Sequence, residues 1–237
     1  MLTLAQEAKG WSDTSTVNKS YVDRFTALVN ADVELSAHRG YIERTASGFG
    51  ERAFHWLWKL LIDEMPKEFS MLEIGVYKGQ VLSLVNLLAT RVGGRAHVTG
   101  VTLLSSFGGF ADEDYAGHIR RVHDEFGLAF PLLIVGDSTE RETQEIAALR
   151  GPYDIVYVDG CHDYDYVVND LLFYPTLLRD GGYLVVDDSS CNLHQPFGYF
   201  QGIEDVSRAV KDVIESNPAY VHLLAVMHNR VWVKKQP

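Results

Sequence analysis

Two apolar runs in the second half of the chain each end in acidic residues. Residues 153–158 lead into Asp159, and residues 181–186 lead into Asp187 and Asp188. Continuous apolar runs of this length indicate buried strands of a parallel sheet, in which neighbouring strands lie about 4.8 Å apart. If the two strands are neighbours, three carboxylates meet at one edge and repel one another unless a cation lies among them. Mg2+ would suit three oxygen ligands. Alternatively, Asp187 caps the next segment and Asp188 forms a surface turn.

Two histidines near these acids are candidates for the general base of a reaction at the same edge. His162 comes three residues after Asp159, and His194 comes six residues after Asp188. Imidazole exchanges a proton near neutral pH, so either side chain could accept one from a substrate. We take His162 as the first choice, with Asp159 as an alternative catalytic group. His162 could instead cap the helix expected at residue 163.

Apolar runs alternate with amphipathic segments from residue 69 onward. Strands are expected at residues 71–76, 96–104, 131–135, 153–158 and 181–188, and helices at 80–91, 143–150, 163–178 and 203–215. This alternation predicts an α/β fold, with a Rossmann-like, mostly parallel sheet covered by helices on both faces. Residues 220–227 and 230–235 are separated only by His228 and Asn229, which predicts a C-terminal antiparallel hairpin and seven strands in all.

The first 65 residues lack this alternation. Apolar residues at helical spacing predict helices at 21–35 and 51–65, so we expect a helical cap or lid over residues 1–65 and a sheet domain over residues 66–237. The polar and aromatic segment at 38–44 could be a lid over a substrate or a surface loop.

The loop after the first strand helps to identify the cofactor. It reads Glu73-Ile74-Gly75-Val76-Tyr77-Lys78-Gly79. In an open α/β sheet, ligands bind beyond the carboxyl ends of the strands, next to this loop. The loop lacks the G-x-G-x-x-G pattern that lets a backbone approach a pyrophosphate, and Tyr77 would obstruct that approach. A cofactor without phosphates therefore fits better than a dinucleotide.

Four motifs together resemble a known family. They are the Glu73–Gly79 loop, Gly136-Asp137-Ser138, the run from Val158 to Tyr164, and the run from Gly181 to Asp188. Over residues 66–237 the sequence resembles the class I S-adenosylmethionine (SAM)-dependent O-methyltransferases, in particular the metal-dependent macrocin O-methyltransferase and cephalosporin-hydroxylase-like group. The resemblance implies a SAM-binding domain at 66–237, SAM and Mg2+ as cofactors, and Asp159, Asp187 and Asp188 as metal ligands.

The resemblance also implies which residues contact SAM. Those expected at its methionine and adenine ends are Glu73, Gly75, Tyr77, Gly79, Asp137 and Ser138. Related folds usually end the second strand with an acid that holds the ribose, but this chain has Thr102 there. Thr102 with Ser105 or Ser106, or an acid from Asp112-Glu113, would take over that role, and Asp159 would border the cofactor as well as the metal.

Charge and composition narrow the choice of partner. A net charge of −11 argues against nucleic acid and against an anionic membrane surface, because both would be repelled over most of the molecule. The sequence contains no apolar run of membrane-spanning length and no signal-peptide pattern, so we expect a cytoplasmic protein with a small-molecule substrate. The resemblance further implies a homo-oligomer.

The sequence thus predicts a SAM- and Mg2+-dependent O-methyltransferase acting on a hydroxylated small metabolite, such as a sugar-bearing natural product. The metal would bind the substrate oxygens and hold one in line with the sulfonium methyl group. Three alternatives stay open at this point: a nicotinamide-dependent oxidoreductase, an accessory or binding protein that keeps the fold, and a metal-independent N-methyltransferase.

Overall fold

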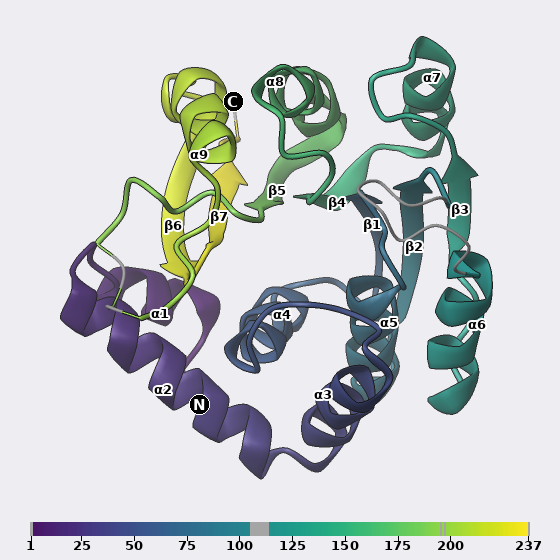
Figure 1. Ribbon diagram of the computed structural model, residues 1–237, viewed down its shortest axis with the longest axis horizontal. Coiled ribbons are helices and arrows are strands. Elements are labelled where there is room, and N and C mark those ends of the chain that lie inside the picture. Colours follow the sequence, from purple (N-terminus) through teal and green to yellow (C-terminus); the bar gives the residue numbers. More distant parts are fainter. Residues whose placement is uncertain (1, 105–113, 195, 197, 237) are drawn as a thin grey trace.

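A seven-stranded sheet forms the centre of the molecule (Figure 1). The computed structural model describes residues 2–104, 114–194, 196 and 198–236, and within them the strand order is β3-β2-β1-β4-β5-β7-β6. The strands are β1 (Glu68–Ile74), β2 (Arg95–Thr102), β3 (Leu132–Val135), β4 (Tyr153–Val158), β5 (Leu178–Val186), β6 (Tyr220–Val226) and β7 (Asn229–Lys234). Strands β1 to β5 pair in parallel, and β7 is antiparallel to both β5 and β6. The predicted fold class and C-terminal hairpin are confirmed.

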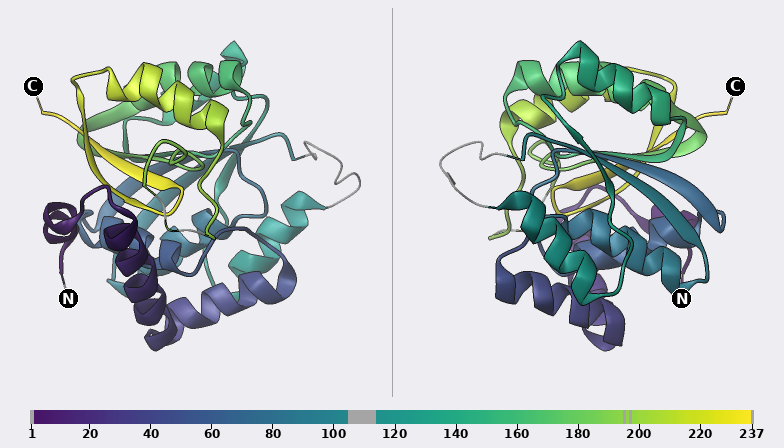
Figure 2. Two further views of the ribbon diagram at one scale, coloured as in Figure 1. Left: turned by 60° about the vertical axis from the view of Figure 1, so that its left-hand side comes forward. Right: turned by 90° about the vertical axis from the view of Figure 1, so that its right-hand side faces the viewer.

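Helices cover both faces of this sheet (Figures 1 and 2). One face carries α7 (Arg141–Arg150), α8 (Tyr164–Phe173) and α9 (Glu204–Val210), and the other carries α4 (Ala53–Asp63), α5 (Gln80–Arg91) and α6 (Tyr115–Glu125). Side chains alternate between the faces along each strand. In β1, for example, Met71 joins the core beneath α4 and α5, whereas Leu72 joins the core beneath α7 to α9.

The N-terminal segment adds a further layer outside α4. It consists of α1 (Leu4–Gly10), α2 (Ser15–Ala31) and α3 (Val33–Thr45). Phe25 and Val29 of α2 are fully buried in the same core as Leu57 of α4 and Met71 of β1. The helix predicted at 21–35 is in fact two helices. They separate at Asp32, whose side chain accepts the backbone N–H of Leu35 and so caps α3.

The polar segment at 38–44 is not a surface loop, because it lies within α3. His38 is fully buried, and its two ring nitrogens lie 2.9 Å from His55 Nε2 and 2.9 Å from Ser83 Oγ. Helix α6 was not predicted, since only three apolar or aromatic residues on one face of this polar segment are buried: Tyr115, Ile119 and Val122.

The topology of the sheet determines where a ligand can bind. The chain runs from β1 outward to β2 and β3, then returns to place β4 on the other side of β1. Such a reversal opens a crevice beyond the carboxyl ends of β1 and β4. Among the helices of the described chain, none has the length and apolar character needed to cross a membrane.

Candidate active site

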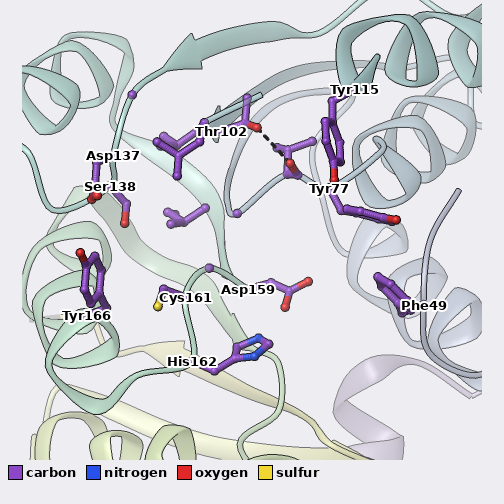
Figure 3. A pocket seen from close by; sticks show the side chains of 17 residues that line it. Phe49, Tyr77, Thr102, Tyr115, Asp137, Ser138, Asp159, Cys161, His162 and Tyr166 are labelled. Carbon is purple, nitrogen blue, oxygen red and sulfur yellow. Dashed lines mark hydrogen bonds between the residues drawn. The ribbon is translucent and has the colours of Figure 1, made fainter. Parts of the chain in front are cut away.

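A cavity of about 290 Å3 lies at this crevice (Figure 3). Its walls come from the loops after β1, β2, β3 and β4 and from the segment before α4. The polar and aromatic residues that line it include Phe49, Tyr77, Thr102, Tyr115, Asp137, Ser138, Asp159, Cys161, His162 and Tyr166.

The loops after β1 and β4 meet closely at the floor of this cavity. The backbone N–H of Asp159 donates to the carbonyl of Ile74 at 2.9 Å, so the β1–β4 pairing continues one residue past β4. Gly75 has a φ of +93°, and a Cβ there would lie 2.0 Å from the Asp159 carbonyl oxygen. A glycine is therefore needed at this position for both its conformation and its contact.

The lining of the cavity suits a cofactor without phosphates. It includes the carboxylates of Asp137 and Asp159, and no Lys or Arg occurs among the described residues that line it. A pyrophosphate would lack a cationic partner here, whereas a sulfonium or ammonium group would be attracted. Aromatic rings close one side, where Phe49 stacks on Tyr77 with ring centroids 5.0 Å apart.

Most of the predicted SAM-binding residues line this cavity, and two do not. Gly75, Tyr77, Thr102, Asp137, Ser138 and Asp159 are among its lining residues. Glu73 and Gly79 instead line a smaller neighbouring space of about 60 Å3, together with Asp187. Alternation along β1 explains the difference for Glu73, because it faces the opposite way from Ile74.

Thr102 is already engaged by its own loop. Its hydroxyl donates to the Val76 carbonyl at 3.0 Å and accepts the Leu104 N–H at 3.1 Å. The expected role in holding ribose is therefore not visible in its contacts, which hold the β1 and β2 loops together instead. The other candidates for this role lie outside the described residues: Ser105, Ser106, Asp112 and Glu113.

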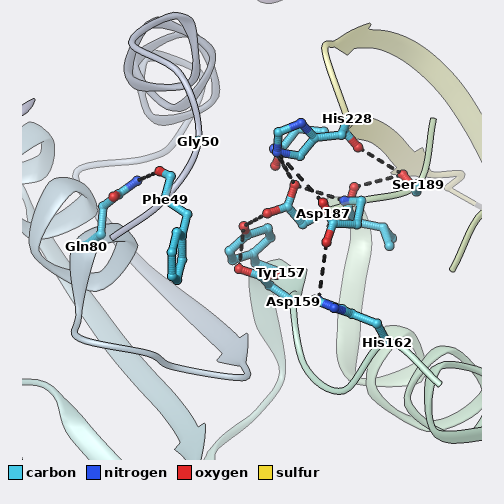
Figure 4. A network of polar contacts seen from close by, with 12 residues as sticks. Phe49, Gly50, Gln80, Tyr157, Asp159, His162, Asp187, Ser189 and His228 are labelled. Atoms are coloured by element: carbon cyan, nitrogen blue, oxygen red, sulfur yellow. Dashed lines mark hydrogen bonds and ion pairs between the residues drawn. The ribbon is translucent and has the colours of Figure 1, made fainter. Parts of the chain in front are cut away.

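Three acids gather beside the cavity (Figure 4). The N–H of Asp187 donates to the Val158 carbonyl at 3.0 Å, which brings Asp187 level with Asp159 on the neighbouring strand. The Tyr157 hydroxyl lies 3.0 Å from a carboxylate oxygen of each. Burial raises the pKa of Asp159 and of Asp187, and the proximity of the two carboxylates raises the pKa of Asp159 further.

Asp188 occupies a tight turn at the end of β5. Its φ is +52°, a left-handed conformation that Asp adopts more readily than most residues. Its carbonyl accepts the N–H of Ile203 at 2.8 Å, which fixes the turn. Burial and the adjacent Asp187 raise the pKa of Asp188 to about 6. His162, which lines the cavity, places Nε2 3.3 Å from an Asp188 carboxylate oxygen.

The turn between β6 and β7 supplies residues that the sequence analysis missed. His228 Nε2 lies 3.4 Å from Asp187 Oδ1 and 3.8 Å from Asp188 Oδ1. Asn229 donates from Nδ2 to Asp187 Oδ1 at 2.6 Å. These contacts arise because β7 is antiparallel to β5, so that β7 begins where β5 ends. The signal in the sequence was the pair His228-Asn229, which we had interpreted only as a turn.

One group within the described residues has the spacing needed to bind a metal ion. Asp187, Asp188 and His228 offer ligand atoms that all lie within 4.8 Å of one another. Asp159, the third ligand in the predicted set, is not part of this group, and its carboxylate meets Asp187 through Tyr157 instead. His228 takes the third place because the turn that carries it approaches both acids at the end of β5.

His194 does not join this site. Its ring nitrogen Nδ1 lies 2.9 Å from Asp13, and its backbone N–H donates to the same carboxylate. Its carbonyl accepts the Asn18 amide, so these contacts tie the loop after β5 to the N-terminal helices. Of the predicted catalytic residues, His162 and Asp159 line the cavity and His194 does not.

Comparison with known proteins agrees with this geometry. Residues 72–189 match a family model described as a methyltransferase domain. No match is found among curated protein sequences. Among solved structures, the SAH-bound methyltransferase PaMTH1 of Podospora anserina is 20% identical with a TM-score of 0.60, covering 93% of this chain and 97% of that one.

Two further structures come from biosynthetic pathways. MycE of the mycinamycin pathway, solved with Mg, SAH and mycinamycin VI, is 20% identical with a TM-score of 0.51, covering 80% of this chain and 50% of that one. The chain thus spans about half the length of MycE. CalS11, a TDP-rhamnose 3'-O-methyltransferase of calicheamicin biosynthesis, is 14% identical with a TM-score of 0.53, covering 94% and 96%. The chain therefore has the Rossmann-like fold of these proteins, and its residues 72–189 match the methyltransferase-domain model.

Proposed function

We propose that this protein transfers the methyl group of SAM to a hydroxyl of a small metabolite and that it uses a divalent cation, with Mg2+ as the ion implied by the family resemblance. The observation that carries the proposal is the position of His162. Its side chain lines the cavity at the carboxyl ends of β1 and β4 and also contacts Asp188 of the metal-ligand group. Cofactor and cation would therefore lie on either side of one histidine.

SAM would occupy the cavity at the carboxyl ends of β1 and β4. Gly75 allows the two loops to approach each other, and Asp159 places its carboxyl group in the lining, where a bound sulfonium would favour its charged form. Asp137 and Ser138 line the end formed by the loop after β3, where the adenine is expected. Phe49 and Tyr77 would shield the bound cofactor from water.

The residues that would hold the cation are Asp187, Asp188 and His228. A buried polar atom supports this assignment. Asn229 is only 2% exposed, and its Oδ1 has no hydrogen-bond partner within the described part of the chain, although its Nδ2 bonds Asp187. Burial raises the pKa of Asp187 and of Asp188, so a bound cation would offset the cost of keeping these carboxylates charged. When bound, a divalent cation supplies positive charge that lowers the pKa of a substrate hydroxyl.

His162 would accept the proton of the acceptor hydroxyl. Its imidazole is held near Asp188, and nearly half of its side-chain surface is exposed, so the proton can pass to solvent. Such a base contributes about 10²–10⁴-fold to rate in characterised enzymes. Asp159 would help to hold Asp187 in position, because the Tyr157 hydroxyl contacts both carboxylates.

The structural neighbours suggest the class of acceptor. MycE was solved with mycinamycin VI, and CalS11 is described as acting on TDP-rhamnose. These neighbours support a sugar-bearing or otherwise hydroxylated small molecule as substrate. A homo-oligomer and a cytoplasmic location stay predictions.

The first experiment is calorimetric titration of SAM, with NAD as a control, into chelator-treated protein and again with Mg2+ present. SAM should bind and NAD should not. Transfer of labelled methyl from SAM to a panel of hydroxylated acceptors would follow, with and without chelator. If SAM binds neither with nor without Mg2+, the proposal is refuted. Binding without transfer would favour an accessory protein, and transfer to nitrogen in chelator would favour a metal-independent N-methyltransferase.

A further inference from the structure

The two ring nitrogens of His228 have different surroundings. Nε2 faces the carboxylates of Asp187 and Asp188 at 3.4 and 3.8 Å. Nδ1 is buried and has no hydrogen-bond partner within the described residues. The ring itself is only 5% exposed and packs edge-on against Phe54, with centroids 4.7 Å apart, and against Phe200, at 5.1 Å. The imidazole is thus fixed in place with one nitrogen toward the acids.

A second unpartnered atom belongs to Glu51, just before α4. Its Oε2 is buried and also lacks a hydrogen-bond partner within the described part of the chain. The charges of Glu51 and His228 interact. Burial lowers the pKa of His228, and the carboxylates of Asp188 and Glu51 oppose that change. Burial raises the pKa of Glu51, and His228 is the strongest of the influences that lower it.

With Nε2 toward two carboxylates, His228 has one of the two features of a metal-binding histidine. A histidine that binds a metal through one nitrogen almost always donates its other N–H to a carboxylate, a carbonyl or water, and this contact fixes its tautomer and orientation. Glu51 precedes Phe54, whose ring packs against His228, and its charge acts on that histidine, although Glu51 Oε2 and His228 Nδ1 are not hydrogen-bonded to each other. Nε2 of His228 is the nitrogen near Asp187 and Asp188. Nδ1 of His228 and Oε2 of Glu51 have no hydrogen-bond partner among the described residues.

We propose that His228 is a nitrogen ligand of the cation, that Glu51 orients it, and that the site consequently binds Mn2+ more tightly than Mg2+. The inference rests on the cation site of the proposed function and names the ion that its donor set selects. Mg2+ strongly prefers oxygen ligands, whereas imidazole nitrogen favours first-row transition metals. The helical N-terminal segment, through Glu51, would then contribute to a site otherwise built on the sheet.

Electron paramagnetic resonance on the full chain tests this directly. Metal-free protein is titrated with Mn2+, and the bound ion is examined for coupling to a ligand 14N nucleus. Wild type should show the coupling, His228→Asn should lose it, and His162→Asn should keep it although that residue also lies near Asp188. Glu51→Gln should keep the coupling but weaken Mn2+ binding about 10–100-fold. Glu64→Gln, an exposed glutamate at the far end of α4, serves as the matched control and should bind normally.

Competition between the two ions gives the second readout. Wild type should bind Mn2+ at least about tenfold more tightly than Mg2+, and His228→Asn should narrow that ratio. Bound Mn2+ without 14N coupling in wild type, or coupling that disappears only in His162→Asn, would overturn the inference. SAM binding is measured on the same samples. If either of these metal results is negative but SAM binds normally, only the inference about His228 fails and the methyltransferase proposal stands. If neither metal nor SAM binds, both the inference and the methyltransferase proposal fail.

Discussion

The hydroxyl oxygen of Tyr157 lies 3.0 Å from Oδ2 of Asp159 and 3.0 Å from Oδ2 of Asp187. One phenolic hydrogen therefore serves two carboxylates on neighbouring strands. Burial raises the pKa of Tyr157 itself well above its ordinary value, and the two acids raise it further. The phenol stays protonated at neutral pH and links the floor of the cofactor cavity to the metal-ligand group.

Replacing Tyr157 with Phe should lower the free energy of unfolding by about 1–3 kcal/mol, because buried acceptors lose their donor. Denaturant unfolding of chelated protein at pH 7 would measure this. Tyr183→Phe, a half-buried tyrosine on β5, is the matched control and should change stability by less than about 0.5 kcal/mol. Equal effects of the two substitutions would show that the Tyr157 hydroxyl does not support the acids.

Divalent cation should stabilise the protein, and the effect should weaken in acid. At 100 times its dissociation constant, an ion that binds only the native state adds about 2.7 kcal/mol. Since Asp188 has a pKa of about 6, proton competition should weaken cation binding as pH falls through 6. Thermal unfolding with Mn2+ or chelator at pH 5 and 7.5 would show this. A cation effect retained in Asp187→Asn would argue against this site.

Glu73 should make the ligand-free protein less stable as pH rises. Burial raises its pKa from 4.5 to about 8, so the native state keeps a proton that the unfolded state has lost. Its contribution is fully present below about pH 4.5 and is lost as pH rises toward 8, at up to about 1.4 kcal/mol per pH unit. Glu73→Gln should gain stability relative to wild type over that range, as measured by denaturant unfolding. Parallel pH profiles for the two proteins would contradict this.

Gly75→Ala should be far more damaging than Gly93→Ala. Both glycines have positive φ, of +93° and +68°, so both substitutions carry backbone strain. Only at Gly75 would the new Cβ meet backbone, 2.0 Å from the Asp159 carbonyl oxygen, whereas nothing lies within 4 Å at Gly93. We expect a loss of about 3–5 kcal/mol and of SAM binding for Gly75→Ala, against about 1 kcal/mol for Gly93→Ala. Similar thermal midpoints would rule out the close approach.

Substitution of His162 and substitution of His194 should have clearly different effects on kcat. His162→Asn should reduce kcat about 10²–10⁴-fold at saturating SAM, since it removes the proposed base. His194→Asn should leave kcat unchanged, because its ring contacts Asp13 instead of lining the cavity. SAM affinity, measured by calorimetry, should be similar in both variants. A rate loss confined to His194→Asn would reverse the assignment.

The sequence by itself determined the alternation of strands and helices and the placement of acids at strand ends. Both are local properties: a buried strand must be apolar along its length, and its polar residues therefore begin where it ends. This logic located Asp159, Asp187 and Asp188, and it predicted the C-terminal hairpin from the spacing around His228.

Only the tertiary structure decided which of these residues meet. His228 reaches the acids because β7 runs antiparallel beside β5, and residues 47–50 before α4 line the same small space as Asp187. Glu73 points away from the larger cavity through the alternation of β1, and His38 is buried because α3 packs against α4 and α5. These contacts join positions far apart in the chain, and no local pattern encodes them, because strand order and helix packing follow from burying the whole core at once.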